Sequence, residues 1–203
     1  MSAGDDAERS DEEERRNLTE LAVLQAVRLK GRVPRDDLDS GVVGSLVASG
    51  FLVDGAMLRL SPEGRARLDE LLAAERSSVD SAALLTAYDE FRSVNVEFKA
   101  LVTDWQLRDG QPNTHEDADY DAGVLGRLDE VHRRVTPIVE AVAIELPRLG
   151  RYSSKLQAAL DRVHAGETMW LSRPLIDSYH TVWFELHEEL ILAAGLTREA
   201  EDA

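Results

Sequence analysis

Apolar residues recur at helical spacing in the first third of the chain. Leu21, Leu24 and Val27 fall on one face of a segment that Asn17 can cap, which predicts a helix from about residue 17. Two short helices are expected after it, one at PRDDL with Pro34 in its first turn and one at VVGSLVAS. The pattern therefore predicts three helices in succession.

A hairpin and a longer helix are expected next. Two short apolar runs in FLVDGAMLRL flank Asp54 and Gly55, and this dipeptide is preferred in tight hairpin turns. In SPEGRARLDELLAAE, Ser61 is a suitable helix cap and Pro62 occupies the first helical position. The predicted order over residues 17–76 is therefore helix, helix, helix, hairpin, helix.

Amphipathic segments fill the rest of the chain. One apolar stripe runs along residues 77–108, a loop follows at 109–118, and Pro147 ends a second helix in which Pro137 should cause a kink. A third helix is predicted within LGRYSSKLQAALDRVHAG, and a fourth starts at Pro174. Four such helices most simply form an antiparallel bundle over residues 77–203, so we expect a mainly α fold. The predicted stripes are Leu84, Tyr88, Phe91, Phe98 and Val102 in the first helix and Tyr120, Val124, Leu128, Val131, Val135, Ile138 and Val142 in the second.

The run LVASGFLVDGAMLRLSPEGRARLDELL resembles a winged-helix domain of the MarR-like kind. In that family a recognition helix ends at a small-residue/Gly step, a two-stranded wing follows, and a Thr/Ser-Pro-x-Gly-Arg segment opens the next helix. The resemblance covers residues 17–76 and implies an N-terminal winged helix-turn-helix with a small β-hairpin wing that binds DNA. The residues expected to face DNA are Arg28, Lys30, Arg32 and Arg35 at phosphates, Ser40 and Ser45 on the recognition helix, and Arg59 on the wing.

The expected recognition helix, SGVVGSLVAS, departs from the family pattern because it contains no Lys or Arg. Helices that read the major groove use side chains such as Arg, Lys, Asn, Gln and Ser to reach bases and phosphates. Protein contact or dimerisation through this domain is therefore the alternative to DNA binding.

Charge narrows the choice of partners. The formal net charge is −16, from 39 acidic and 23 basic residues, which disfavours non-specific binding to nucleic acid or an anionic membrane. Residues 15–76 hold ten basic and nine acidic residues, so a polyanion is expected only there. The N-terminal run MSAGDDAERSDEEERR is acidic and has no apolar stretch. We therefore expect residues 1–16 to be disordered and to carry no secretory signal.

The chain contains no cysteine, which removes disulfides, thiolate catalysis and Cys-based zinc sites. No apolar run is long enough for a membrane span. No phosphate loop, nucleophile elbow or pair of catalytic carboxylates is present in the sequence. We therefore expect a cytoplasmic, non-enzymatic protein without a metal or a cofactor.

The fourth predicted helix, within RPLIDSYHTVWFELHEELILAAGL, has an apolar arc that includes His180 and His187. The two histidines lie seven residues apart, or about 10.5 Å along the axis, so one metal ion is not expected to bind both. Asp177 lies one turn before His180 and can share a hydrogen bond or an ion with it. Glu185 and Glu189 face away from the arc and are expected in solvent.

Asn95 is a second polar residue within an apolar stripe. An unpaired buried amide costs roughly 1–3 kcal/mol, so Asn95 needs either a neighbouring side chain or a bound ligand. Lys99 and Arg173 are the nearest cations for a carboxylate ligand, and Arg173 precedes a helix N-terminus, where anions are favoured. The candidate ligand-binding residues are Asn95, Lys99, His132, Arg173, Asp177, His180 and His187. The alternative is that these polar groups are satisfied within the core.

Together these features favour a homodimeric transcriptional regulator that binds a palindromic DNA site and senses a small-molecule effector through its C-terminal bundle. The first alternative is an interaction module that regulates a partner enzyme without binding DNA. In this connection, MWLSRPLIDSYHTVWFELHEELI resembles sequence from actinobacterial proteins linked to phosphoenolpyruvate-utilising enzymes, although their Thr-Ser-His phospho-acceptor motif is absent. A small enzyme or metal protein that uses Asp177, His180 and His187 is the third hypothesis.

Overall fold

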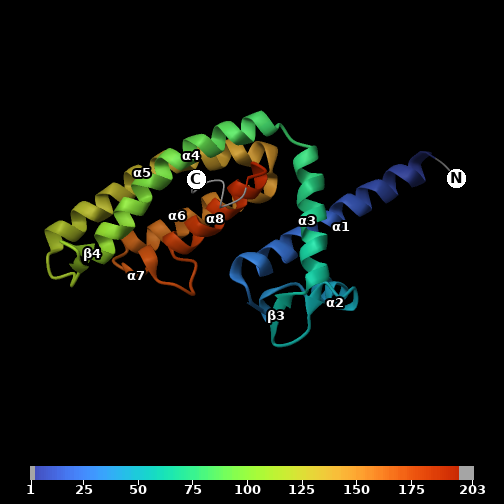
Figure 1. The fold of residues 1–203 in the computed structure, drawn as a ribbon, viewed down its shortest axis with the longest axis horizontal. Coiled ribbons are helices and arrows are strands. Elements are labelled where there is room, and N and C mark those ends of the chain that lie inside the picture. The colour runs from blue at the N-terminus through green and yellow to red at the C-terminus, as the bar shows by residue number, and fades with distance from the viewer. Residues whose placement is uncertain (1–2, 197–203) are drawn as a thin grey trace. The chain divides into compact units, whose positions relative to one another are not determined.

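A computed structural model of the chain describes the backbone of residues 3–196 and the side chains of residues 12–196. The described chain is mainly helical, as the sequence predicts. It divides into two compact units, Met1–Ser78 and Val79–Ala203, which we call unit 1 and unit 2 (Figure 1). The division lies two residues after the boundary expected from the sequence.

Unit 1 combines helices with a small antiparallel sheet of order β1-β3-β2. Its elements are α1 (Ala3–Lys30), β1 (Val33–Pro34), the 3-10 helix η1 (Arg35–Asp37), α2 (Ser40–Ala48), β2 (Leu52–Val53), β3 (Met57–Leu60) and α3 (Pro62–Ser77). In the sheet, Val33 lies opposite Leu58, and Leu52 lies opposite Leu60. Helix α1 contacts α2, α3 and β3, and Leu24 on α1 is fully buried. The core of unit 1 therefore lies between α1 and the elements that follow it.

Helix α1 begins at Ala3, whereas the sequence predicted a disordered segment up to residue 16. Residues 1 and 2 of that segment lie outside the described residues. Extending an existing helix costs little once its later turns are held by packing, as Leu24 and Val27 are held here. Acidic residues near a helix N-terminus are also favourable because they face the positive end of the helix dipole.

The hairpin formed by β2 and β3 is joined closely to the first turn of α3. Ser61 Oγ accepts a hydrogen bond from the Gly64 amide at 2.8 Å and donates one to the Gly50 carbonyl at 2.6 Å. A Cβ atom on Gly64 would lie 1.9 Å from the Phe51 carbonyl oxygen, so only glycine fits at this close approach. The serine and glycine of the SPEGR segment thus attach α3 to the hairpin.

Unit 2 is built from long helices joined by short connections. Its elements are α4 (Ser81–Gln106), β4 (Leu107–Arg108), β5 (Gln111–Pro112), α5 (Ala118–Glu145), the 3-10 helix η2 (Pro147–Gly150), α6 (Arg151–His164), α7 (Met169–Ser172) and α8 (Tyr179–Ala193). Helices α4 and α5 run antiparallel, since Asp104 pairs with Arg127 while Ser93 accepts a hydrogen bond from Arg134. Helix α8 contacts both α4 and α6.

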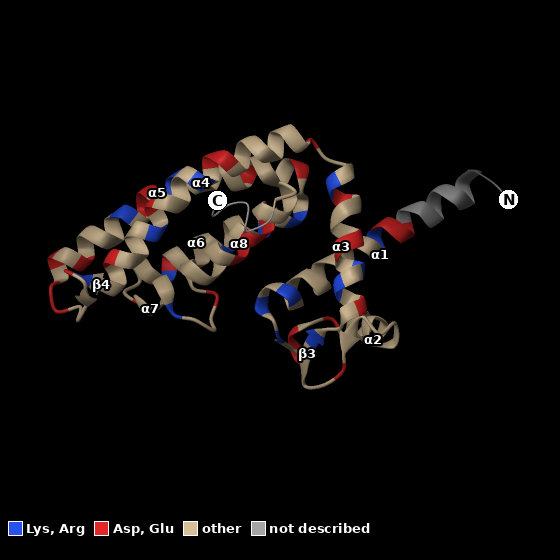
Figure 2. Ribbon diagram, in the orientation of Figure 1, with Lys and Arg blue, Asp and Glu red and all other residues tan. Residues whose placement is uncertain are grey.

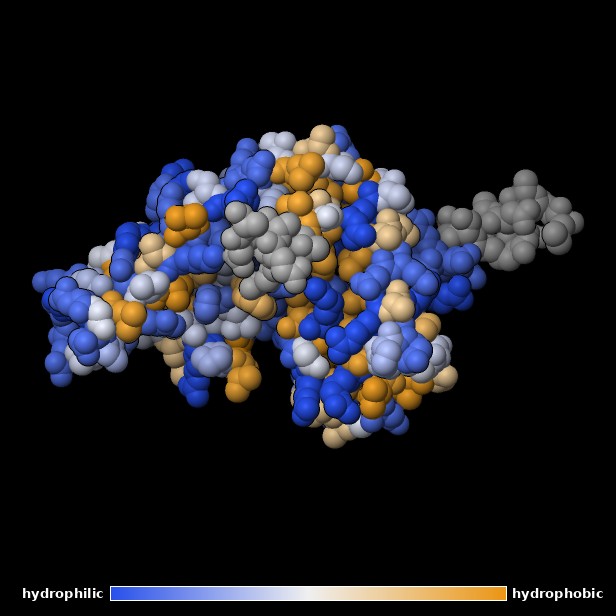
Figure 3. Space-filling model, viewed as in Figure 1, coloured by the Kyte–Doolittle hydropathy of each residue, from blue (hydrophilic) through white to orange (hydrophobic). Residues whose placement is uncertain are grey.

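The predicted apolar stripes of α4 and α5 are confirmed, because they are buried in one core, with Tyr120 only half-buried at its edge. Pro137 lies inside α5, and the helix continues through it to Glu145. Some apolar side chains remain exposed, including Leu18 in unit 1 and Val96 and Ile144 in unit 2. Figure 3 shows such apolar patches between hydrophilic areas on the visible face.

The sequence predicted that the fourth helix starts at Pro174. In the structure, helix α8 begins at Tyr179. Ser178 caps it by accepting a hydrogen bond from the Thr181 amide. Leu175 has a φ of +68°, so the helix cannot extend back through this residue. Asp177 therefore lies in a turn before the helix, and its predicted position one helical turn before His180 is wrong.

Candidate functional site

A groove between α4 and α8 brings together four of the seven candidate ligand-binding residues, Asn95, Lys99, His180 and His187. The two helices run antiparallel here, since Phe98 of α4 contacts the His180 ring near the start of α8 and Tyr88 contacts the His187 ring further along. The groove has a volume of about 420 Å³, within the range of small-molecule pockets. We call it the α4–α8 groove, and it is lined by Asn95, Phe98, Lys99, Val102, Thr103, Gln106, His180, Trp183, Phe184 and His187.

Asn95 presents hydrogen-bond donors to this groove. Its side-chain oxygen Oδ1 accepts a hydrogen bond from Trp183 Nε1 at 2.9 Å. Its amide nitrogen Nδ2 has no partner among the described residues, although Asn95 is only 5% exposed. Because the oxygen is already engaged, the N–H groups of Asn95 are what a ligand would meet.

Lys99 and His180 lie at the exposed rim of the α4–α8 groove. Within the described part of the chain, the Lys99 ammonium makes no ion pair and the His180 ring makes no hydrogen bond. Partial burial, which includes a ring contact with Phe98 at 6.0 Å, lowers the pKa of His180 below its ordinary value. The ring is therefore mainly neutral at pH 7 and can donate or accept a hydrogen bond.

His187 differs from His180 because it forms part of the groove wall. It is only 6% exposed, and its ring lies 5.3 Å from that of Phe91 and 6.4 Å from that of Tyr88. The two histidines of the fourth predicted helix thus have different surroundings, one at the rim and one in the aromatic core.

The lining of the α4–α8 groove suits an anionic ligand with an apolar body. It contains no carboxylate, although the chain has a net charge of −16. Phe98 and Trp183 pack with their ring centres 4.3 Å apart, and Phe184 is 44% exposed beside them. A flat apolar group can pack against these rings while an acidic group accepts hydrogen bonds from Asn95 and Lys99.

The other three candidate ligand-binding residues lie outside this groove. His132 on α5 contacts the Tyr179 hydroxyl at 3.2 Å and Gln157 Oε1 at 3.1 Å, so both ring nitrogens are engaged. Asp177 pairs with Lys155 at 3.1 Å instead of with His180. Arg173 is exposed near Met169, on the segment before α8. Their separation follows from partners on other helices, which the spacing within one helix does not reveal.

Two carboxylates of α8 are buried, so the prediction that they face solvent is wrong. Glu189 is fully buried, and it accepts hydrogen bonds from Arg148 at 2.5 Å and from Arg151 at 3.0 Å. Glu185 is 4% exposed and lies 3.4 Å from Lys155. The reason is that α8 packs against α6 as well as α4, so both of its faces are covered.

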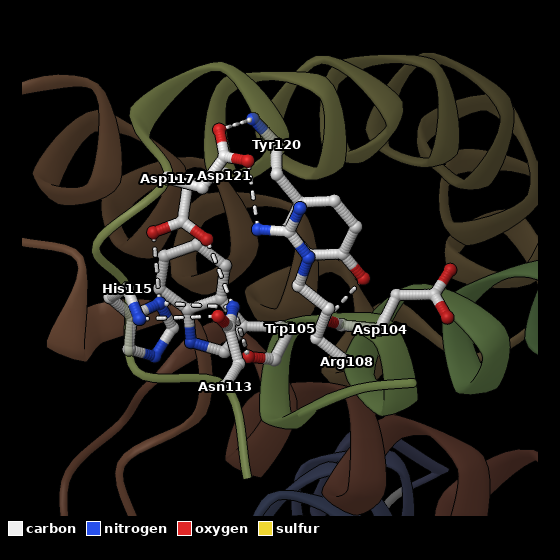
Figure 4. Close-up of polar contacts among 8 residues, drawn as sticks. All are labelled: Asp104, Trp105, Arg108, Asn113, His115, Asp117, Tyr120 and Asp121. Atoms are coloured by element: carbon white, nitrogen blue, oxygen red, sulfur yellow. Dashed lines mark hydrogen bonds and ion pairs between the residues drawn. The ribbon is translucent and has the colours of Figure 1, made fainter. Parts of the chain in front are cut away.

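The predicted loop at residues 109–118 holds a polar cluster that the sequence reasoning did not identify (Figure 4). His115 Nδ1 lies 2.9 Å from Asp121, and its ring packs 4.4 Å from that of Trp105. Asn113 Nδ2 donates to Asp121 at 3.0 Å and to the Trp105 carbonyl at 3.2 Å. The sequence signal was the run of Asn, His and Asp, a composition that is also common in ordinary turns.

A second group in Figure 4 continues this cluster toward α5. Arg108 pairs with Asp117 at 2.8 Å and lies 4.7 Å above the Tyr120 ring, while the Tyr120 hydroxyl donates to the Asp104 carbonyl at 3.0 Å. Asp117 also caps α5, and these contacts hold its pKa below the ordinary value. A His–Asp pair can activate a serine or threonine hydroxyl for catalysis. Among the described residues, no such hydroxyl forms a hydrogen bond with His115. The cluster therefore fastens the end of α4 to the start of α5.

The predicted DNA-binding residues of unit 1 differ in their surroundings. Arg28 and Arg59 line one pocket together with Arg65, which the sequence reasoning had not singled out. Arg35 pairs with Asp54 at the hairpin turn. Lys30, Arg32 and Ser40 are exposed. Figure 2 shows basic residues at the C-terminal end of α1, on β3 and on α3.

Helix α2 exposes only small side chains. Gly41, Gly44, Ser45 and Ala48 are exposed, and Ser45 Oγ donates to the Gly41 carbonyl at 3.3 Å. Beside Ser45, a groove of about 850 Å³ separates α2 from α1, and Arg15 and Arg16 line its α1 side. These two arginines lie in the segment predicted to be disordered and are not among the predicted DNA contacts.

The remaining observations give no additional site. Among residues with described side chains, no group of three or more His, Asp or Glu is placed to hold a metal ion. In the same part of the chain, no helix is both long and apolar enough to cross a membrane.

Comparisons with protein-family models, with curated proteins and with solved structures gave no match to this chain.

Proposed function

We propose that this protein is a ligand-responsive, DNA-binding regulator. Unit 1 is the DNA-binding module, with a winged-helix arrangement in which α2 is the recognition helix and the β2–β3 hairpin is the wing. Unit 2 is an effector-binding and dimerisation module, in which α4, α5, α6 and α8 form an antiparallel four-helix bundle. Its effector is a small organic acid bound in the α4–α8 groove.

The observation that carries the proposal is the set of unengaged donors in the α4–α8 groove. Asn95 lines the groove with its Nδ2 unpaired within the described structure, and Lys99 at the rim makes no ion pair there. A bound carboxylate would accept hydrogen bonds from both groups, and hydrogen bonds to a charged group are worth about 1.5–3 kcal/mol. No acid lines the groove, so nothing within it opposes a negative charge.

Support for the DNA-binding half comes from unit 1. The helix–helix–hairpin–helix order of α1, α2, β2–β3 and α3 is the order of a winged-helix domain, and β1 adds a third strand to the hairpin. Arg32 and Arg59 are exposed and have no ion-pair partner among the described residues. Such cations are able to meet DNA phosphates.

Ligand binding is tested by calorimetric titration of the full chain with benzoate, benzamide and benzylamine, which share a ring and differ in charge. We expect benzoate to bind more tightly than the other two probes. Lys99→Gln should weaken benzoate binding, whereas Arg173→Gln removes the same charge outside the groove and should leave it unchanged. Equal binding of benzoate and benzylamine would contradict the proposed anion site.

DNA binding is tested by selection from a pool of random duplexes at about 50 mM salt, where phosphate contacts are strongest. We expect the protein to enrich a palindromic sequence, because a dimer would present two equivalent modules. Benzoate should change the affinity for the enriched duplex in the wild type and have less effect in Lys99→Gln. If no duplex is retained above background, the DNA-binding half of the proposal is wrong.

A protein-interaction module is the second candidate, and one observation favours it. The exposed face of α2 carries Gly41, Gly44, Ser45 and Ala48 and no cation, so another helix can approach its backbone closely. Under this alternative, unit 1 contacts a partner enzyme, and Gly44→Arg should abolish that contact. The same substitution adds a phosphate-binding charge to α2, so it should preserve or strengthen DNA binding if unit 1 is a DNA module.

A further inference from the structure

Three arginines from three elements meet in one pocket at the base of the hairpin in unit 1. Arg28 comes from the last turns of α1, Arg59 from β3 and Arg65 from the first turn of α3. The pocket has a volume of about 300 Å³, and Val27 and Leu60 are among its apolar lining residues. We call it the arginine pocket.

Two of the three arginines in this pocket make no ion pair within the described structure. Arg59 and Arg65 are exposed and make no ion pair with any described residue. Their neighbours in unit 1 differ, since Arg35 pairs with Asp54 and Arg67 pairs with Glu20. Arg59 and Arg65 therefore have their guanidinium groups available to another partner.

The rest of the lining adds no negative charge. No Asp or Glu lines the pocket, and Glu63, the acid nearest in sequence to Arg65, is not part of it. The pocket borders the N-terminus of α3 at Ser61 and Pro62, where the dipole of this 16-residue helix is positive. An anion here would meet the exposed guanidinium groups of Arg59 and Arg65, with Arg28 in the pocket lining, and a helix N-terminus of the same sign.

We propose that the arginine pocket binds a phosphate group. Guanidinium groups donate paired hydrogen bonds that match the oxygens of phosphate, and three arginines approaching from different elements suit a tetrahedral group better than a planar carboxylate. The group is either a backbone phosphate of DNA or the phosphate of a small molecule. Its role as a DNA contact rests on the proposed function of unit 1, whereas its role as a small-molecule site does not.

The test uses the full chain and two probes, inorganic phosphate followed by calorimetry and a labelled duplex followed by fluorescence anisotropy at several salt concentrations. The variants are Arg59→Gln and Arg65→Gln. The matched control is Arg76→Gln, which removes the same charge from α3 about 16 Å further along the helix. Because Arg59 and Arg65 are exposed, the variants should melt at the wild-type temperature.

If the pocket contacts DNA, Arg59→Gln and Arg65→Gln should each lower the slope of log affinity against log salt by about 1. If it binds a small phosphorylated molecule, the two variants should weaken phosphate binding about 10-fold or more, while duplex binding is absent or unchanged. The first outcome supports both proposals. The second supports the arginine pocket, and an absence of duplex binding then removes the DNA-binding function of unit 1.

The proposal is overturned if the two variants behave like Arg76→Gln with both probes. If phosphate binding and duplex binding both persist unchanged in all three variants, the proposed DNA-binding function is intact and the arginine pocket alone is rejected. The two failures are therefore distinguishable.

Discussion

At the scale of single residues, the polar exceptions in apolar stripes were the most informative part of the sequence. Asn95 and His187 interrupt predicted core faces, and both line the α4–α8 groove, with Lys99 and His180 at its rim. Helical periodicity was sufficient to identify them because each groove wall is a single helix. It was not sufficient for His132, whose partner Gln157 lies on another helix.

The surroundings of His180 predict a pH dependence for unit 2. Its pKa in the folded protein lies below the ordinary 6.5 because burial disfavours the charged ring. Just below pH 6.5, the unfolded chain therefore binds more protons than the folded protein. The free energy of unfolding of unit 2 is therefore highest above that pH and decreases as the pH falls. We expect the melting temperature to drop between about pH 7.5 and pH 5.5, and His180→Gln should reduce this drop.

Thermal melts of wild type and His180→Gln, followed by tryptophan fluorescence, measure the effect. All three tryptophans, Trp105, Trp170 and Trp183, belong to unit 2, so the signal reports on that unit alone. His164→Gln is the control, because His164 pairs with Asp129 outside the groove. Identical pH dependence in wild type and His180→Gln would contradict the prediction.

Gly64 carries the second prediction at this scale. In Gly64→Ala the new Cβ would collide with the Phe51 carbonyl oxygen, 1.9 Å away. We expect unit 1 to lose about 1–3 kcal/mol of unfolding free energy or more, as is typical of overpacked sites. Gly44→Ala is the control, since no atom lies within 4 Å of its added Cβ, and it should raise stability by about 0.5–1 kcal/mol. Urea unfolding followed by far-ultraviolet circular dichroism compares the two variants.

At the scale of elements, caps and apolar periodicity located the helix cores well and the helix ends less well. Ser61 and Pro62 marked the start of α3 correctly. The start of α8 was misplaced because Pro174 also looks like a first-turn proline, whereas Ser178 is the actual cap. Acidic composition predicts disorder for the first 16 residues and does not reveal the extension of α1 to Ala3.

The attachment of α8 to α6 gives a prediction about buried charge. Glu189 is fully buried between Arg148 and Arg151, whereas Glu185, one turn earlier, has an oxygen without any partner in the described structure. Glu189→Gln should cost about 3 kcal/mol, because it leaves two arginines uncompensated. Glu185→Gln is the matched control and should cost less than about 1 kcal/mol, since Lys155 keeps Asp177 as a partner. Urea unfolding followed by tryptophan fluorescence would reject this assignment if the two variants lost equal stability.

At the scale of the whole molecule, the sequence predicted a mainly helical chain, and the division into two units falls close to the expected boundary. Composition and charge indicate which classes of partner are disfavoured, but they do not show where on the protein a partner binds. The arginine pocket depends on Arg28, Arg59 and Arg65, which are far apart in sequence and meet only because α1, β3 and α3 pack together. Contacts of this kind cannot be inferred from the spacing within one element.

The proposed homodimer predicts a mass of about twice 22.5 kDa by light scattering after size exclusion. Val96 on α4 and Ile144 on α5 are 68% and 79% exposed, and we propose that the dimer interface includes them. Val96→Lys combined with Ile144→Lys should shift the protein toward the monomer. Leu18→Lys, which changes an exposed apolar residue of unit 1, should not. A monomer at all concentrations would rule out the dimer.

The close join between Phe51, Ser61 and Gly64 has a consequence for protein engineering. Because the carbonyl of Phe51 sits where a Gly64 side chain would be, the hairpin and the first turn of α3 are shaped to each other. A chimera that replaces the hairpin alone would pair a foreign backbone with a helix start fitted to the original one. Grafts between such domains should therefore exchange residues 50–65 as a single cassette.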